Sequence, residues 1–302
     1  MAEPAPAIAG DLLTLAEIQS LRRVSGLRSA ALVVHAWAVI AGAVIVYAVW
    51  PSIVTLALAV AVIGARQLGL MVLVHEAVHW RLFDNAKVNN RVGLWLCAYP
   101  IWGELPAYRR RHHLHHRHTL DDEDPDLALV APFPISRRTF WTNVARDLTG
   151  TTACVCVARW PAWRGGAAAL WRALRGPVTA NLVIFGVLAA LGRWELYVLL
   201  WLLPLATWYQ LASRIRDTAE HAMVSDGSDP LRNTRTVTAG PLARVFLAPY
   251  WMSYHLEHHL FVFVPCWNLR RAHALLLAKG HGARMEVTPS YVEVIRRVTA
   301  GR

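Results

Sequence analysis

Residues 109–120 read RRRHHLHHRHTL and place three histidines, His112, His115 and His116, in the spacing HxxHH. Side chains three or four residues apart share one face of a helix, so these imidazoles can converge. Imidazole nitrogen is a common ligand of iron, zinc and copper. A single histidine-rich run can also lie solvated on a surface, so the interpretation depends on whether the spacing recurs.

Ligand spacing recurs in three other segments of the chain. HxxHH returns at residues 255–259, HEAVH at residues 75–79 places two histidines at i and i+4, and one histidine follows Glu220. Nine histidines are too many for one metal ion and enough for two. The predicted metal ligands are His75, His79, His112, His115, His116, His221, His255, His258 and His259. We expect His113 and His118 to support the site or lie at the surface, and His273 and His281 to have no part in it.

The composition indicates an integral membrane protein. Hydrophobic residues make up 55% of the 302 residues and charged residues 17%, whereas soluble domains have about 45–50% and about 25%. The net charge of +11 is therefore attributed to membrane topology, and no nucleic-acid partner is expected. The four cysteines form no CxxC pair and are expected to be reduced. Because the histidine segments extend from 75 to 259, residues 1–302 are predicted to form one domain.

Four apolar runs predict an all-α protein with four transmembrane helices. A run of about 20 apolar residues is long enough to cross the hydrocarbon core of a bilayer. Short turns join the first span to the second and the third to the fourth, so the spans are expected to pair as two hairpins. Residues 75–176 and 213–302 would then form a helical cap on one side, together with both termini. The predicted spans are residues 30–50, 52–74, 177–191 and 194–212.

The distribution of basic residues predicts the orientation of the protein. Of the 31 Lys and Arg residues, Arg66 lies inside a span and Arg193 in a turn on the far side. The other 29 lie on the side of the histidines. Basic residues are enriched in cytoplasmic loops, so the cap, both termini and the histidine cluster are predicted to be cytoplasmic.

Shorter segments are expected outside the four spans. Residues 11–24 have the pattern of an amphipathic helix, which could lie in the membrane interface or be an ordinary helix that docks on the protein. Residues 92–107 are too short to span and contain two prolines, which suits a re-entrant or interfacial segment. Residues 137–175 mix tryptophan with arginine, which is typical of helices at the headgroup level. A last helix is predicted to begin with Thr288 as its N-cap and Pro289 in its first turn.

Acidic residues stand beside the predicted ligands. Glu76, Glu220 and Glu257 each adjoin a predicted ligand, and ligating histidines commonly donate their second N–H to a carboxylate. These three glutamates could serve that role or be solvated charges. Four aspartates follow the second histidine segment, within DDEDPD at residues 121–126, where Asp124 and Asp126 could instead cap a helix or turn.

Three sequence motifs in this order resemble those of the membrane fatty acid desaturase and hydroxylase superfamily. They are HEAVH, then HHLHHRHT followed by DDEDPD, then YHLEHHLF, and the resemblance covers residues 65–280. It implies two iron ions that use O2 to oxidise an unactivated C–H bond. In acyl desaturases of this kind a further histidine follows the last span, with an asparagine four residues earlier that acts through water. His221 matches that histidine, but Asp217 replaces the asparagine, so Asp217 is a possible water-mediated ligand.

The resemblance also implies a lipid substrate in the membrane and a separate electron donor, such as a ferredoxin, because no fused redox module is recognised. Three functions remain open from the sequence. The first is desaturation of a fatty acyl chain, and the second is hydroxylation or ketolation, for example of a carotenoid. The third is metal transport or sensing, which is disfavoured because transporters place their ligands near the middle of the membrane.

Overall fold

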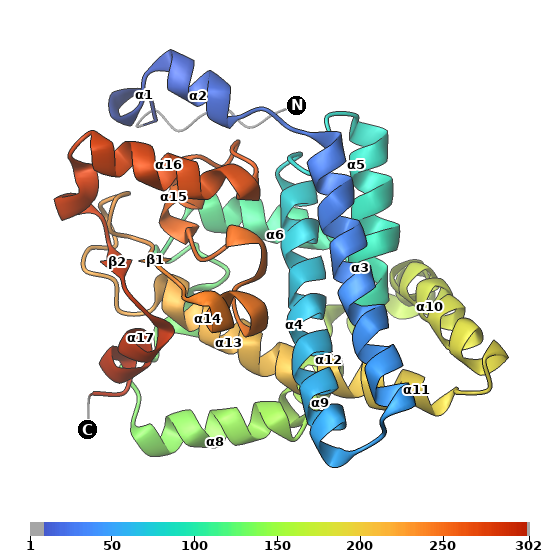
Figure 1. The fold of residues 1–302 in the computed structure, drawn as a ribbon. Helices are drawn as coiled ribbons and strands as arrows, with labels where there is room; N and C mark the ends of the chain where they lie inside the picture. The colour runs from blue at the N-terminus through green and yellow to red at the C-terminus, as the bar shows by residue number, and fades with distance from the viewer. Residues whose placement is uncertain (1–8, 301–302) are drawn as a thin grey trace.

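The computed structural model describes residues 9–300, and residues 1–8 and 301–302 of the predicted domain lie outside the described part. Helices dominate the described residues, and one two-stranded parallel sheet joins β1 to β2 (Figure 1). The elements are α1 Ala9–Leu12, α2 Leu15–Leu21, α3 Gly26–Val49, α4 Ile53–Val78, α5 Ala86–Val92, η1 Gly93–Ala98, η2 Tyr99–Ile101, α6 Leu105–Arg117, α7 Leu127–Val130, α8 Arg137–Leu148, α9 Thr151–Ala158, η3 Pro161–Gly165, α10 Gly166–Ala190, α11 Glu195–Tyr197, η4 Val198–Leu202, α12 Leu203–Ala206, α13 Trp208–His221, β1 Thr236–Val237, α14 Pro241–Phe246, η5 Pro249–Trp251, α15 His255–Leu260, α16 Cys266–Ala278, η6 His281–Arg284, β2 Val287–Thr288 and α17 Tyr291–Val298.

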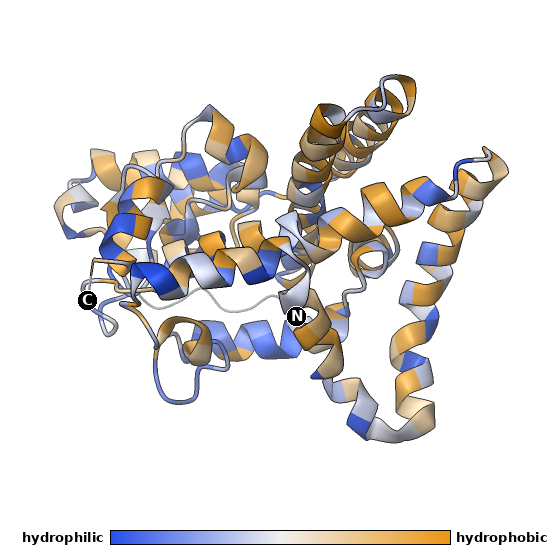
Figure 2. Ribbon diagram, turned by 90° about the horizontal axis from the view of Figure 1, so that it is seen from below, coloured by the Kyte–Doolittle hydropathy of each residue, from blue (hydrophilic) through white to orange (hydrophobic). Residues whose placement is uncertain are grey.

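Four helical segments are long and apolar enough to cross a membrane. They are Gly26–Val49, Ile53–Val78, Thr151–Ala190 and Glu195–His221. In the hydropathy colouring the longest helices are mostly orange, and much of the blue ribbon gathers on the side of the molecule where the C-terminus lies (Figure 2). The four apolar segments support a membrane protein, as the composition predicted.

The helices that contain the third and fourth predicted spans extend beyond those spans. The third predicted span begins at Pro177, but α10 begins at Gly166 and Pro177 lies inside it. The preceding residues are rich in alanine, leucine and arginine, which favour helix strongly enough to extend it upstream of the proline. The fourth segment was expected to end at residue 212, but no helix breaker follows, and α13 continues to His221.

Helix α4 lies at the centre of the fold. It contacts α3 along its length and also contacts α6 and α13 (Figure 1). Helix α13 approaches α4 closely at Gly64, where an added Cβ would lie 2.7 Å from the Cβ of Trp208. Inside the bundle the Arg66 guanidinium donates to the carbonyl of Val245 at 2.7 Å. Since α4 also carries the first histidine segment, these contacts fix the position of that segment.

The ends of the described chain pack on the C-terminal elements. Helices α1 and α2 lie beside α16 (Figure 1), where the Asn268 amide donates to the carbonyl of Leu21 at 2.7 Å. The prediction that Thr288 caps the last helix is wrong, because Thr288 lies in β2. Helix α17 begins three residues later, at Tyr291, and its N-cap is Ser290, whose hydroxyl accepts from the backbone N–H of Glu293.

Candidate metal centre

Four helices bring the nine predicted ligands together. The last turn of α4 carries His75, and His79 follows as its C-cap residue. Helix α13 ends at His221, and the remaining six histidines lie on α6 and α15. Because helices are stiff, imidazoles at i, i+3 and i+4 project from one face of each. The centre is therefore assembled at the ends of two apolar segments, Ile53–Val78 and Glu195–His221, and on two short polar helices.

The nine histidines form two groups, each small enough to surround one ion. Within each group one ligand atom per residue lies within 4.8 Å of all the others. Both groups combine residues from segments far apart in the sequence. The first group is His75, His79, His112, His116 and His258, and the second is His115, His221, His255 and His259.

The distances between ring nitrogens within the groups fit metal ligands. In the first group the Nε2 atom of His116 lies 3.0 Å from the Nε2 atoms of both His112 and His258. In the second, the Nε2 atom of His255 lies 2.9 Å from that of His221 and 3.1 Å from that of His259. Two nitrogens bound at right angles, each about 2.1 Å from one metal ion, lie about 3 Å apart. The ring nitrogens of one group cannot all accept hydrogen bonds from one another. A cation shared by the group would bind their lone pairs instead.

Burial favours the neutral form of five cluster histidines on α6 and α15, and the neutral form is the one that binds metal. Desolvation lowers the pKa of these five histidines, and the neighbouring imidazoles lower it further. This holds for His112, His116, His255, His258 and His259.

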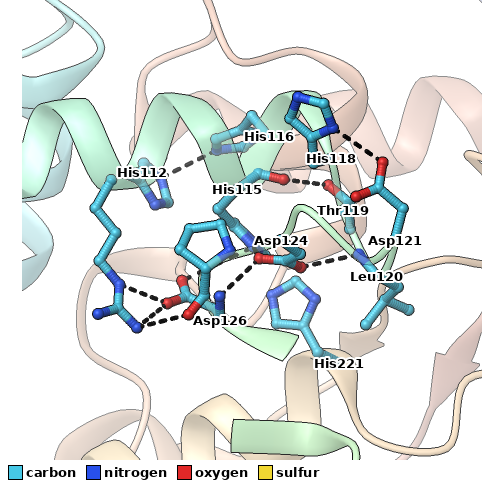
Figure 3. A network of polar contacts seen from close by, with 12 residues as sticks. His112, His115, His116, His118, Thr119, Leu120, Asp121, Asp124, Asp126 and His221 are labelled. Atoms are coloured by element: carbon cyan, nitrogen blue, oxygen red, sulfur yellow. Dashed lines mark hydrogen bonds and ion pairs between the residues drawn. The ribbon is translucent and has the colours of Figure 1, made fainter. Parts of the chain in front are cut away.

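Asp124 orients His115 for the second group. Its carboxylate lies 2.9 Å from His115 Nδ1 and accepts from the backbone N–H groups of Leu120 and Asp126 (Figure 3). Burial alone would raise the pKa of Asp124, but these hydrogen bonds outweigh it and hold the pKa below its usual value. An ionised carboxylate only accepts, so His115 Nδ1 is the donor and Nε2 keeps its lone pair for a metal.

The three glutamates beside the ligands have different surroundings. Glu220 Oε2 lies 3.5 Å from His255 Nδ1 and also pairs with Arg216. Glu76 accepts from the backbone N–H of Cys266 at 2.9 Å and so ties α4 to the start of α16. In both cases the carboxylate is buried beside a cluster histidine.

Glu257 binds partners outside the cluster. Its carboxylate accepts from the Thr236 hydroxyl at 2.5 Å and from His273 Nδ1 at 2.6 Å. His273 belongs to neither histidine group, and its contact is with Glu257, on the segment of α15 between His255 and His258. His273 lies on a separate helix, α16, so no sequence pattern indicated its contact with Glu257.

Arg235 is a supporting residue that the sequence did not assign. Its side chain is 1% exposed, and its guanidinium donates to the carbonyls of Ala219, Ala222 and Met223 at 2.9–3.0 Å. Backbone carbonyls at a helix C-terminus lack intrahelical donors and need other partners. Arg235 therefore caps the end of α13 and holds His221 in place.

A cavity of about 310 Å³ adjoins the second group. His115, His221 and His255 line it, together with Asp217, the predicted water-mediated ligand. The Asp217 carboxylate is partly exposed and lies 3.8 Å from Arg216. Asp217 belongs to neither histidine group, and its role as a water-mediated ligand stays a prediction.

Comparisons with known proteins agree with this architecture. The fatty acid desaturase family model matches residues 48–289. Dihydrorhizobitoxine desaturase of Bradyrhizobium elkanii is 31% identical over 71% of this chain and 66% of its own length. Two beta-carotene ketolases of Paracoccus sp., from strains PC1 and N81106 / MBIC 01143, are 28% and 26% identical, each over 67% of this chain and 73% and 72% of theirs. The chain thus spans just under two thirds of the length of the first relative.

Proposed function

Because this chain belongs to the fatty acid desaturase family, a family of oxidoreductases that act on lipids, we propose that it is a membrane-bound di-iron enzyme that uses O2 to introduce a double bond into a fatty acyl chain. The observation that carries the proposal is the division of nine buried or half-buried histidines into two groups of metal-binding size. One group would serve a single metal, whereas two adjacent groups suit a two-metal centre.

The donor set fits iron. Imidazole suits iron, zinc, copper and nickel. The histidine groups contain neither thiolates nor bridging carboxylates, so the coordination geometry and the redox role decide which of these metals binds. When bound, two iron ions would supply the redox chemistry by which O2 removes hydrogen from an unactivated C–H bond. The nine histidines would hold the ions, Asp124 would keep His115 in the correct tautomer, and Asp217 would contact the centre through water.

The atoms of the proposed reaction balance with one external reductant. The acyl chain loses two hydrogens to form the double bond. O2 takes up those two hydrogens together with two electrons and two protons from a donor, and two waters leave. Within the described residues the four cysteines are free, and their spacing is unlike that of the iron–sulfur motifs, so a separate donor such as a ferredoxin would deliver the electrons.

We also propose the membrane topology of the chain. Residues 1–302 would form one domain in which the four apolar segments pair as two hairpins and the remaining helices form a cytoplasmic cap. Relative to the spans predicted from the sequence, residues 30–50, 52–74, 177–191 and 194–212, 29 of the 31 Lys and Arg residues lie on the side of the histidines, which supports a cytoplasmic centre under the positive-inside rule.

Oxygen insertion is the second candidate function. Two of the relatives are named beta-carotene ketolase, and the same histidine groups would serve hydroxylation or ketolation of a carotenoid. In that case the substrate gains oxygen and no double bond forms.

Expression of the chain with a ferredoxin system in cells that contain both fatty acids and carotenoids separates the two functions. Loss of two hydrogens from an acyl chain, measured by mass spectrometry, would establish desaturation, whereas gain of oxygen by a carotenoid would establish the alternative. The controls are His115→Ala and His258→Ala, one from each group, which should abolish turnover while the protein stays in the membrane. Normal turnover by either variant would refute the assignment of ligands, and a purified protein that binds no iron would refute the proposal.

A further inference from the structure

Residues 241–251 pack against the apolar helices, although the sequence placed them in the polar cap. They contain α14 and η5 and lie outside the four apolar segments. Helix α4 contacts both elements, and Figure 1 shows α14 beside the middle of α4 rather than beside its histidine end. We call residues 241–251 the α14–η5 segment.

Arg66 indicates how deep α14 lies. Its guanidinium donates to the carbonyl of Val245 at 2.7 Å. Arg66 stands eight residues before residue 74, where the predicted span ends on the histidine side, and eight residues extend about 12 Å along a helix axis. Helical side chains lean toward the N-terminus of their helix, which in α4 is the end away from the histidines. A span that crosses the bilayer therefore carries Val245 below the membrane surface.

Two other helices hold the segment inside the predicted spans. Trp208 Nε1 donates to the carbonyl of Phe246 at 3.2 Å, and the Tyr250 hydroxyl donates to the carbonyl of Leu32 at 3.3 Å. Trp208 belongs to the fourth predicted span and Leu32 to the first. Because contacts with three helices agree, the placement does not depend on the boundary of one span.

The exposure of the segment follows the rule for backbone in lipid. Lipid-exposed backbone must be helical, and non-helical backbone at membrane depth must be buried in protein. On α14, Leu242 is 75% and Val245 46% exposed. The turn and short helix that follow are covered, with Ala248 1% and Tyr250 8% exposed. Gly69 of α4 leaves room for the Tyr250 ring, since an added Cβ would lie 2.9 Å from it.

The end of α14 is also satisfied as lipid requires. The last carbonyls of a helix lack intrahelical donors, and within a bilayer no water can supply them. The carbonyls of Val245 and Phe246 receive side-chain donors from α4 and α13 instead. Since Arg66 is 6% exposed, its charge is buried in the bundle on a backbone carbonyl, which is how cations inside membranes are usually placed.

We propose that the α14–η5 segment re-enters the membrane from the histidine side, that Arg66 anchors it, and that Leu242 and Val245 contact the acyl chains of the bilayer. This inference goes beyond the proposed function and rests on the proposed topology, in which it moves part of the cap into the membrane. It also links the bilayer to the metal centre, because α15 begins at His255, four residues after the end of η5 at Trp251.

A fluorophore attached to α14 tests the inference. The double variant Cys154→Ser/Cys156→Ser removes the two exposed cysteines, and Cys97 and Cys266 are fully buried and should not be labelled. In that background Leu242→Cys carries the fluorophore nitrobenzoxadiazole. If α14 stood upright, Leu242 would lie only about 4.5 Å from the level of Val245, three residues away.

Two reference sites have similar exposure. Ile45, inside the first predicted span on α3, is 60% exposed, and Val292, on α17, is 58% exposed. In lipid nanodiscs, lipids with a nitroxide on the acyl chain should quench the fluorophore at Leu242 and Ile45 alike, whereas iodide in the water should quench it several-fold more strongly at Val292. Iodide quenching at Leu242 equal to that at Val292, with Ile45 shielded, would overturn the inference alone. Strong iodide quenching at all three sites would overturn the membrane topology as well.

A second pair of variants tests the anchor. Arg66→Met removes the donor to the Val245 carbonyl, so iodide quenching at Leu242 should rise several-fold. The matched control is Gln67→Met, because the Gln67 amide donates to the carbonyl of Trp201 at 2.8 Å and not to α14, and quenching should not change. Unchanged quenching in Arg66→Met would refute the anchor. The measurement needs neither iron nor turnover, so a shielded Leu242 in a protein that oxidises no lipid would count against the proposed function alone.

Discussion

Asp124→Asn tests whether the carboxylate behind His115 tunes the second histidine group. The aspartate accepts three hydrogen bonds, two at Oδ1, from His115 Nδ1 and the Asp126 N–H, and one at Oδ2, from the Leu120 N–H. In the variant, an amide oxygen can keep the first two. The amide NH2 then faces the Leu120 N–H, donor against donor.

The size of the effect follows from these contacts. A buried N–H left without an acceptor costs about 1–3 kcal/mol of folding stability, with or without metal bound. Loss of an outer partner of a ligating histidine typically lowers metal affinity about 10–100-fold. We therefore expect the second group to bind Fe(II) about 10–100-fold more weakly, with the first group unaffected.

The assay is competition for Fe(II) between the purified protein and a chelator, with the iron content measured by mass spectrometry. Asp124→Asn should lose about one of two irons at a chelator concentration that leaves the parent protein loaded. The matched control is Asp121→Asn, three residues away, where the carboxylate is 55% exposed and contacts His118. If the two variants retain iron equally, the assignment of Asp124 as the positioning residue of His115 is refuted.

Three further predictions concern stability. Arg235→Met leaves three carbonyls at the end of α13 without donors and should lower the free energy of unfolding by about 3 kcal/mol or more; an unchanged Tm would contradict the cap. Gly64→Ala should lower the free energy of unfolding by about 1–3 kcal/mol, because the added methyl group forces α4 away from Trp208. The control is Gly42→Ala, which has open space around it and should not lower the Tm. Metal-free protein should be most stable above about pH 6.5, the pKa of unfolded histidine. It should lose Tm as the pH falls from there, because the folded pKa of the cluster histidines on α6 and α15 is lower and the unfolded chain takes up more protons; a flat Tm from pH 7 to 5 would refute this.

The sequence predicted that nine histidines would meet, but it could not sort them into groups. Adjacent residues on a helix point about 100° apart, so His115 and His116 of one motif belong to different groups, as do His258 and His259. That division depends on how α6 and α15 rotate against α4 and α13, which is set by packing between helices and leaves no local pattern. The roles of these histidines as ligands remain predictions.

The supporting residues were less predictable than the histidines. Acids next to a ligand in sequence were candidates for its partner, yet His115 is oriented by Asp124, which is nine residues away and reaches it through a turn. Arg235 acts on carbonyls 12 to 16 residues earlier in the chain. Helix periodicity predicts which side chains share a face, whereas contacts made by loops depend on the path of the backbone between helices.

The two groups draw on the four helices unequally. Helices α6 and α15 supply both groups, while α4 supplies the first group alone and α13 the second alone. The separation of two bound metals would therefore follow the spacing between α4 and α13, which pack closely where Trp208 meets Gly64. That contact lies 11 residues before His75 on α4 and 13 residues before His221 on α13. Packing between these two helices would therefore influence the geometry of a bound metal pair.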